Sequence, residues 1–254
     1  MLTLKEMIKK NIPLSEVLKK NAEQHRRYDM YTSMERALGV LHTGEIYISN
    51  GANWNDVNDR TLMDANNAYG LCLSCSTREN IAMWMLYGAN HGKDGAMLML
   101  YPSVMKDLVN AGTIELGYFQ KNGKFHKAYT LKNRVDYEAY LSDVVYIDPC
   151  KDGMVRLTEG ESHVTVNQSI LKGSDIYYKD YAWSYEKECR FVIKLNDYWI
   201  KTAKNEKLPN IRVKMSDSSR NKMTYERLIR SPVYSGTSTR GVDSKLFKKV
   251  DWNL

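Results

Sequence analysis

Hydrophobic and polar residues alternate along several short segments of the chain, and a period of two is typical of β-strands. The most informative segment is 183–190, with the sequence WSYEKECR, because it leads directly into the apolar residues 191–193. If the whole segment is one strand, Glu186, Glu188 and Arg190 point to the same face. Two carboxylates and a guanidinium on a central strand are costly to bury unless they are paired or functional. We therefore take this face as the best candidate for an active site.

The same periodicity divides the rest of the chain into short elements. The N-terminal segment predicts an amphipathic helix that is interrupted near Pro13. A strand at 26–31 is followed by Thr32 and Ser33, which are good helix N-caps, and then by Gly44, which is typical of the position after a helix. The sequence predicts further strands at 45–49, 71–76, 96–100, 114–119, 144–147 and 226–230, and further helices at 80–87, 103–112 and 243–249.

This order of elements favours an α+β fold, with a split or mixed β-sheet core and flanking helices. Only five prolines and no low-complexity tract interrupt the 254 residues, so we expect a single domain over 1–254. The helical segment at about 1–24 is interpreted as an N-terminal extension. The polar region at about 150–180 is interpreted as an insertion or a substrate-facing loop.

The charge and the cysteine content indicate which partners and which cellular compartment to expect. The formal net charge is +7 and the pI is near 9.0, which fits a nucleic-acid partner, although the lysines are scattered rather than blocked. No apolar run approaches the length of a membrane span, so we expect no membrane contact. The four cysteines follow no secreted-type framework, which predicts reduced thiols and a cytoplasmic location. Cys72 and Cys75 have the spacing of metal ligands, but the sequence has no matching second pair. We therefore expect these two cysteines to be small buried residues, and we expect no metal.

Several common chemistries lack a motif in this sequence. It contains no glycine-rich phosphate loop, no G-x-S-x-G elbow, and only five widely spaced histidines. What remains is a set of polar and aromatic residues on or near the predicted strands. Aromatic faces that stack on a nicotinamide ring, together with a carboxylate that accepts a hydrogen bond from a ribose hydroxyl, would suit a dinucleotide.

Motifs spread over residues 28–193 resemble known ADP-ribosyltransferases. The segment 31–49 is similar to the opening strand–helix–strand of members that act on nucleic acid, and Glu186-Lys187-Glu188 resembles their E-x-E motif. The pairs Asn55-Asp56 and Met83-Trp84, the residues Tyr87 and His91, and the segment 183–190 also resemble a broad, poorly characterised bacterial and phage-defence family. Members of that family include toxins that ADP-ribosylate messenger RNA and are held in check by an antitoxin and a chaperone.

The resemblance implies roles for single residues. The second glutamate of the E-x-E motif is the catalytic one, so Glu188 would be catalytic and Glu186 would aim the nucleophile. The first motif of the superfamily is usually a histidine or arginine on the first strand, and here Tyr31, Tyr28 or Arg27 would take that position. Strand alternation places Tyr31 and Tyr28 on opposite faces and leaves open which tyrosine meets the cofactor, although Tyr31 joins the catalytic set.

The remaining implied roles concern binding. NAD is the implied cofactor, consumed as a substrate, and the residues implied to bind it are Arg27, Tyr28, Tyr47, Ser49, Asn55, Trp84, Tyr87 and His91. Arg190 is expected either to contact a nucleic-acid phosphate or to serve as an internal counter-ion. RNA is the implied acceptor, and an antitoxin and a chaperone are the implied protein partners.

Two other functions are compatible with the same residues. A non-catalytic module could sense a nucleotide or a phage component through the aromatic pocket. A nuclease could use Glu186 and Glu188 with a divalent ion, but the sequence offers few acidic ligands at suitable spacing. The structural alternative for Glu186, Glu188 and Arg190 is an ion-pair ladder on a half-exposed strand.

Overall fold

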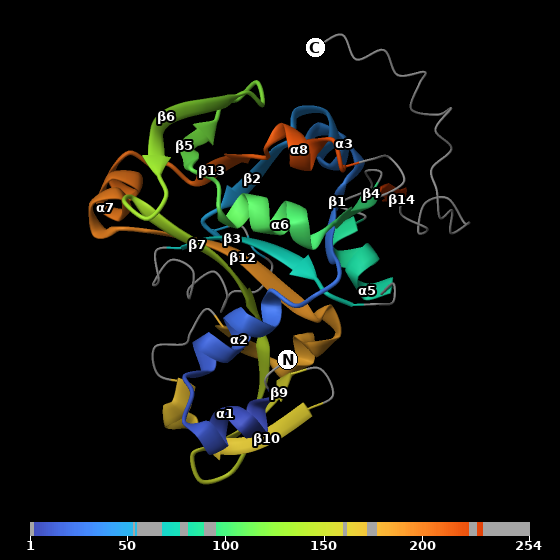
Figure 1. Cartoon of the computed structure of the whole chain (residues 1–254), viewed down its shortest axis with the longest axis vertical. Helices are drawn as coiled ribbons and strands as arrows, with labels where there is room; N and C mark the ends of the chain where they lie inside the picture. The colour runs from blue at the N-terminus through green and yellow to red at the C-terminus, as the bar shows by residue number, and fades with distance from the viewer. Residues whose placement is uncertain are drawn as a thin grey trace.

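The computed structural model describes residues 3–52, 54, 68–76, 81–88, 95–159, 162–171, 177–223 and 228–230. Over these residues the chain is α+β, as predicted, with a large sheet and a small sheet. The large sheet occupies the upper part of Figure 1, and the small sheet lies at the lower end with helices α1 and α2. Asn55, His91 and the helix predicted at 243–249 lie outside the described residues.

The large sheet branches at its central strand, β3 (Ala68–Ser74). One edge of β3 pairs along its whole length with β12 (Glu188–Leu195). The other edge pairs with β1 only through Asp29 and Ser74, and with β2 only through Ser49 and Gly70. All pairings within this sheet are antiparallel, and its other strands are β1 (Tyr28–Ser33), β2 (Glu45–Ser49), β4 (Gly95–Leu100), β5 (Thr113–Phe119), β6 (Phe125–Lys132), β7 (Tyr137–Asp143), β13 (Asn210–Lys214) and β14 (Leu228–Arg230). The sheet therefore splits into two branches, β1-β4-β14 and β2-β13-β5-β6.

Helices cover one face of the large sheet and bury the main hydrophobic core. Apolar residues of α3 (Met34–Thr43), α6 (Pro102–Val109) and α7 (Asp197–Asn205) pack there against alternate strand residues such as Phe191 and Ile193. Helix α3 begins after Ser33, whose hydroxyl accepts a hydrogen bond from the Arg36 amide, and it ends at Gly44 in the left-handed region. The N-cap and the glycine stop that the sequence predicted are therefore confirmed.

The chain passes almost directly from the large sheet to the small one. Val144 alone separates β7 from β8 (Val145–Pro149), and Figure 1 shows β7 running downwards between the two sheets. The strands β9 (Met154–Glu159), β10 (Ser162–Asn167) and β11 (Tyr178–Asp180) complete the order β10-β9-β8-β11, in which β11 is parallel to β8. Much of the polar region 150–180 therefore forms sheet rather than loop.

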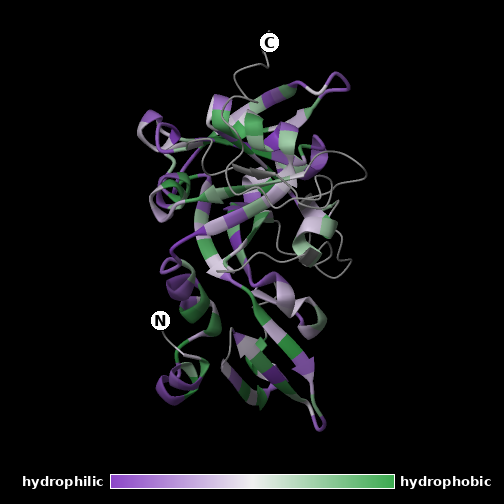
Figure 2. Ribbon diagram, turned by 90° about the vertical axis from the view of Figure 1, so that its right-hand side faces the viewer, coloured by the Kyte–Doolittle hydropathy of each residue, from purple (hydrophilic) through white to green (hydrophobic). Residues whose placement is uncertain are grey.

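The first two helices close a second core over the small sheet. Buried apolar residues of α1 (Leu4–Lys10) and α2 (Leu14–Ala22) pack with Val155, Leu157 and Val192. In Figure 2 the two helices carry hydrophilic residues on their outer turns, and hydrophobic and hydrophilic residues alternate along the neighbouring strands. The amphipathic helix with a break near Pro13 is confirmed. No described helix has the length and apolar character needed to cross a bilayer.

Two predicted elements are wrong in detail. The strand expected over 183–190 begins only at Glu188, because 181–186 is a 3₁₀-helix and Lys187 is left-handed with φ 45°. The Asp180 carboxylate starts that helix by accepting a hydrogen bond from the Ala182 amide at 2.8 Å. The helix expected over 80–87 consists of a short α5 (Ile81–Met83) followed by a π-helical turn, Trp84–Gly88.

Gly39 and Gly44 give a matched test of how helix α3 ends. Gly39 lies inside the helix with no heavy atom within 4 Å of an added Cβ, whereas Gly44 has φ +68° and an added Cβ would lie 3.2 Å from Arg220 Cδ. We expect Gly39→Ala to raise the free energy of unfolding by about 0.5–1 kcal/mol. Gly44→Ala should lower it by about 1 kcal/mol or more, because alanine is strained in the left-handed region. Urea denaturation of both variants measures the difference, and equal stabilities would contradict this account of the helix end.

Candidate functional site

Four charged side chains meet where the small sheet joins the large one. Lys179 Nζ lies 2.7 Å from Glu186 Oε2 and 3.4 Å from Glu188 Oε2. On the other side of Glu188, Arg190 Nε lies 2.7 Å from Oε1 and Nη2 lies 3.3 Å from Oε2. All four side chains are buried, and Arg190 has no exposed surface. The cluster is an alternating row of acids and bases withdrawn from bulk water, so each member depends on its neighbours.

The backbone turn at Lys187 brings the two carboxylates together. In a straight strand Glu186 and Glu188 would stand side by side along one face, but the left-handed residue between them lets both reach the same ammonium group. The turn is tied to β3, because the Cys75 amide donates to the Lys187 carbonyl at 2.9 Å and the Ser74 hydroxyl donates to the Glu186 carbonyl at 2.8 Å. The prediction that the two glutamates act together therefore agrees with their positions, although the common strand was wrong.

The small sheet supplies the cation and a phenol. Lys179 of β11 is paired with Tyr146 of β8 in the parallel register. The Tyr146 hydroxyl accepts a hydrogen bond from the Glu188 amide at 2.8 Å. The Val144 amide donates to the Glu188 carbonyl at 3.0 Å. Both sheets thus hold the first residue of β12, and this contact positions the cluster.

Aromatic rings surround the charges. The Tyr87 hydroxyl donates to Glu186 Oε1 at 2.7 Å. The Trp183 ring centroid lies 4.7 Å from Lys179 Nζ, and the Trp54 ring centroid lies 5.5 Å from Arg190 Cζ. Such cation–π contacts stabilise a positive charge without neutralising it. The two indole rings therefore help to keep Lys179 and Arg190 charged.

The two carboxyl groups have opposite pKa shifts. Burial and then the charge of Glu188 raise the pKa of Glu186 to about 7, against the opposing effects of Lys179 and Tyr87. Burial would also raise the pKa of Glu188, but the positive charges of Arg190 and Lys179 and the hydrogen bond from Arg190 lower it well below its ordinary value. Near neutral pH, Glu188 is therefore an anion while Glu186 exchanges a proton.

The strand register shows which face of the sheet carries Glu188. Opposed residues of antiparallel strands point to the same face, and Glu188 opposes Ser74, which opposes Asp29. Tyr31, two residues beyond Asp29, therefore shares this face. Its ring meets that of Trp84 edge-on, with 4.9 Å between centroids.

Cys72 of the central strand lies on the same face of the sheet as Glu188. It lies directly opposite Arg190 in the register of β3 and β12. Its thiol also forms a hydrogen bond with Glu188. This side chain therefore adds a thiol to the groups that surround the Glu188 carboxylate.

Two residues assigned to binding from the sequence have other roles here. Tyr28 points to the opposite face, is buried in the main core, and donates its hydroxyl proton to the Ala22 carbonyl at 2.5 Å. Arg190 is an internal counter-ion of Glu188 rather than a phosphate ligand, because a guanidinium with no exposed surface cannot meet a nucleic acid. Alternation along the strand left both possibilities open for each residue, and only tertiary packing distinguishes them.

The other predicted binding residues are dispersed. Arg27 pairs with Asp29 at 2.8 Å and donates to the Ser76 carbonyl at 3.0 Å, on the branch that carries Tyr31. Tyr47 shares the face of Glu188 but contacts Phe119 and Phe125 on the other branch, 4.9 and 5.3 Å away between centroids.

Ser49 and Trp84 lie away from the charged cluster as well. The Ser49 hydroxyl accepts a hydrogen bond from the Gly51 amide at 3.4 Å, which is the turn role of a residue at a strand end. Trp84 is buried beneath Tyr31. Of the predicted set, the structure brings Tyr87, Glu186, Glu188 and Arg190 into one cluster, and Tyr31 to the neighbouring strands.

Lys179 and Tyr146 are the two members of the described cluster that the sequence analysis did not predict. Each lies in a segment whose role depends on pairing with a distant strand, and no local motif surrounds either one. The only local signal for Lys179 is its position among the tyrosines 177, 178 and 181, in a region that the sequence marked as substrate-facing.

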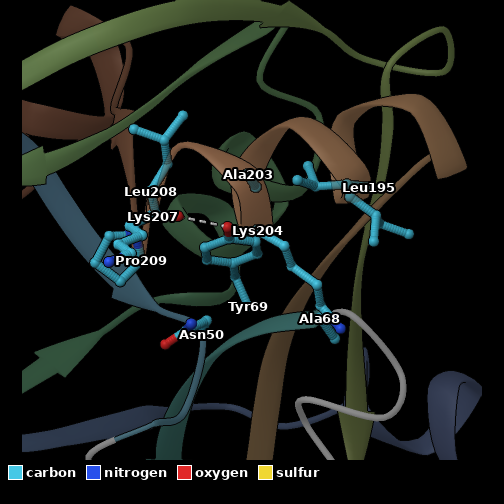
Figure 3. Close-up of a pocket in the computed structure, with 10 residues that line it drawn as sticks. Asn50, Ala68, Tyr69, Leu195, Ala203, Lys204, Lys207, Leu208 and Pro209 are labelled. Carbon is cyan, nitrogen blue, oxygen red and sulfur yellow. Dashed lines mark hydrogen bonds between the residues drawn. The ribbon is translucent and has the colours of Figure 1, made fainter.

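A separate pocket of about 310 Å³ opens between α7 and the ends of β2 and β3 (Figure 3). Its described lining consists of Asn50, Ala68, Tyr69, Leu195, Ile200, Ala203, Lys204, Lys207, Leu208 and Pro209. The Tyr69 hydroxyl donates to the Leu208 carbonyl at 2.7 Å across it. These described residues include no carboxylate, and in this they differ from the cluster at Glu188.

Comparison with known proteins assigns no family to the chain. No protein-family model, no curated protein and no solved structure matches it. A function therefore has to be inferred from the acid–base cluster and the sheet face around it.

Proposed function

We propose that the chain is an NAD-dependent ADP-ribosyltransferase that transfers ADP-ribose to RNA, acting as a toxin in anti-phage defence. The observation that carries the enzymatic part is the pair Glu186 and Glu188, which share one ammonium group but differ in pKa direction. When the environments of two adjacent carboxyl groups push their pKa values apart, one group stays ionised and the other can accept or release a proton near neutral pH. The resemblance of Glu186-Lys187-Glu188 to the E-x-E motif agrees with that division of roles.

In the proposed reaction Glu188 stabilises the ribose. Cleavage of the bond between nicotinamide and the ribose C1′ builds positive charge on the ring, as in glycoside cleavage. Glu188 stays ionised because Arg190 holds its carboxylate at 2.7 Å. A fixed anion in a buried site stabilises such charge far better than an exposed one does. It also accepts a hydrogen bond from the ribose 2′-hydroxyl.

Glu186 is the proposed general base. The acceptor attacks C1′ as the nicotinamide bond breaks, and the proton that the acceptor loses passes to Glu186. A pKa of about 7 suits this task, because the group is then partly ionised and still basic near neutral pH. Lys179 links the two carboxylates before substrate binds, and the cationic ribose would compete with it for Glu188.

The NAD site is proposed on the face of the sheet that carries Tyr31. Tyr31 is half-buried, so one part of its ring is available to stack, and Trp84 supports it from below. Arg27 lies on the same branch with about a third of its side chain exposed, 35%, which suits a pyrophosphate contact. Asn55 and His91 stay predictions, because they fall outside the described residues.

The β5–β6 hairpin is the proposed docking surface for RNA. Phe119 is 42% exposed at its tip and packs on Phe125 with 5.5 Å between centroids. Exposed lysines follow along the same hairpin: Lys121, Lys124 and Lys127. Exposed aromatic rings beside lysines are typical of surfaces that stack single-stranded bases and hold their phosphates.

The hairpin and the proposed catalytic site lie on the same face of the large sheet. The register from β12 through β3, β2 and β13 to β5 puts Phe119 on the same face as Glu188. Four strand spacings separate them across the sheet, roughly 20 Å, and an offset of six residues along the strands adds roughly another 20 Å. A single strand of RNA bound at the hairpin would therefore extend over the sheet towards the cluster.

A non-catalytic nucleotide-sensing module is the second candidate, and one observation favours it. Every charge in the cluster already has a partner, as in a purely structural network. The same observation disfavours a metal-dependent nuclease, because two positive side chains occupy the carboxylates that would have to bind the cation. The sensing module predicts NAD binding without a covalent product.

Glu188→Gln is expected to reduce NAD consumption by at least a hundredfold, because the neutral amide cannot stabilise the ribose cation. The measurement is release of nicotinamide from labelled NAD, with separate pools of RNA, DNA and protein as acceptors. We expect label on RNA with the native chain and none with the variant. If the folded native chain neither binds nor consumes NAD with any of these acceptors, the proposed function is wrong.

Two controls separate chemistry from folding. Circular dichroism and thermal melting establish that Glu188→Gln is folded, since it leaves Arg190 and Lys179 with less compensation. NAD binding that survives in this variant, with no product formed even by the native chain, would support the sensing module instead.

The transfer rate is expected to rise with pH through about 7. Glu186 has to be ionised to accept a proton, and its pKa is raised from the ordinary value to about 7. Tyr87→Phe removes a hydrogen bond that stabilises the ionised form, so the rise should move to higher pH. Glu186→Gln should abolish the rise together with most of the activity. An unchanged pH profile in Tyr87→Phe would exclude Glu186 as the titrating group.

The variant Phe119→Ala should weaken RNA binding by about tenfold or more, since loss of one stacked base costs about 1–3 kcal/mol. NAD hydrolysis in the absence of RNA should not change, because the hairpin lies apart from the cluster. Tyr198→Ala is the matched control, since Tyr198 on α7 is an even more exposed aromatic residue at 68%. Equal loss of RNA binding in the control would show that the hairpin has no special role.

A further inference from the structure

A second cluster of chemically active side chains lies on the opposite face of the large sheet from Glu188. One donor atom from each of His25, Cys75 and Asp143 lies within 4.8 Å of the other two. His25 Nε2 and Asp143 Oδ1 are 2.7 Å apart. The mechanism proposed above uses none of these residues.

Strand ends assemble this cluster. His25 lies between α2 and β1, Cys75 follows β3, and Asp143 is the last residue of β7. Asp143 is paired in register with Cys189 of β12, which is fully buried and forms side-chain hydrogen bonds with Asp143 and Cys75. Residues that are far apart in the sequence thus converge at one point under the start of β12.

We propose that His25, Cys75 and Asp143 bind a transition-metal ion, zinc in the first instance, and that this site is distinct from the proposed NAD site. Imidazole nitrogen, thiolate sulfur and carboxylate oxygen are the three ligand types that zinc takes in proteins. Magnesium and calcium prefer all-oxygen sites, and the thiolate disfavours both. Cys189 or a water molecule would complete a tetrahedral set.

The geometry needs little adjustment to accept the ion. Zinc bonds of about 2.0–2.3 Å in a tetrahedron place the donor atoms roughly 3.3–3.8 Å apart. The present limit of 4.8 Å between donors therefore calls for shifts of about 1 Å, within the reach of side-chain rotation. His25 and Cys75 are only half-buried, so an ion has access from solvent.

A metal ion at this position would stabilise the strands that carry the proposed active site, from the opposite face of the sheet. Glu188 and Cys189 are consecutive residues of β12 whose side chains point to opposite faces. The strands β3 and β7 flank β12, so an ion bound between their ends would hold both of them in place beside Glu188 and Cys189. Its expected contribution is therefore to the stability of this corner of the sheet, and not to the transfer step.

The simplest alternative is a hydrogen-bonded His25–Asp143 ion pair with a neighbouring thiol. The two explanations differ in an observable that does not involve NAD. We expect the full-length chain, purified without chelator, to hold about one zinc ion per molecule, measured by elemental analysis. Cobalt substitution should add a sulfur-to-metal absorption band, and a chelator should lower the melting temperature.

Substitutions test which residues bind the metal ion. Cys75→Ser should lose the cobalt band and at least tenfold in zinc affinity, whereas Cys150→Ser, at a half-buried cysteine on the small sheet, should keep both. His25→Gln removes a second ligand while keeping a hydrogen-bonding group, and provides the test if Cys75→Ser does not fold. A native chain without zinc, with no cobalt band and no chelator effect, overturns the proposal. That result would leave the NAD-dependent activity untouched, and loss of that activity would equally leave the metal measurement intact.

Discussion

The contact of Lys179 with Glu186 and Glu188 is the interaction on which the rest of the site depends. Two carboxylates buried side by side cannot both stay ionised unless a positive charge lies between them. Lys179 supplies that charge at 2.7 and 3.4 Å, and it comes from the small sheet while Glu188 opens a strand of the large one. Docking of the two sheets therefore lowers the pKa of both carboxyl groups, while Arg190, on the same strand as Glu188, supplies the larger part of the charge that keeps Glu188 ionised.

Local elements of this fold were predictable because their causes are local. Ser33 caps α3 through its own hydroxyl, and Gly44 ends the helix because its backbone adopts the left-handed region. Lys187 shows the limit of such reasoning. Lysine carries no signal for a left-handed conformation, so the pattern at 183–190 predicted a continuous strand, and the 3₁₀-helix that ends at Glu186 was missed.

The candidate site was predictable only in part, because side-chain pairing over long sequence distances creates it. Alternation showed that Tyr28 and Tyr31 point in opposite directions, but the register of Asp29 with Ser74 was needed to put Tyr31 on the face of Glu188. Lys179 lies near Glu186 in the sequence, yet its role arises from parallel pairing with β8. A short local pattern contains no information on which strand such a residue will join.

The first residues of β12 are constrained from both faces, and this shapes what each face can do. Glu188 belongs to a charged cluster beside Cys72, while Cys189 adjoins the His25, Cys75 and Asp143 group behind the sheet. A strand buried on both sides leaves little freedom for either side chain. A displacement that relieves one cluster must therefore disturb the other, so the electrostatics at Glu188 and the packing behind it are mechanically coupled.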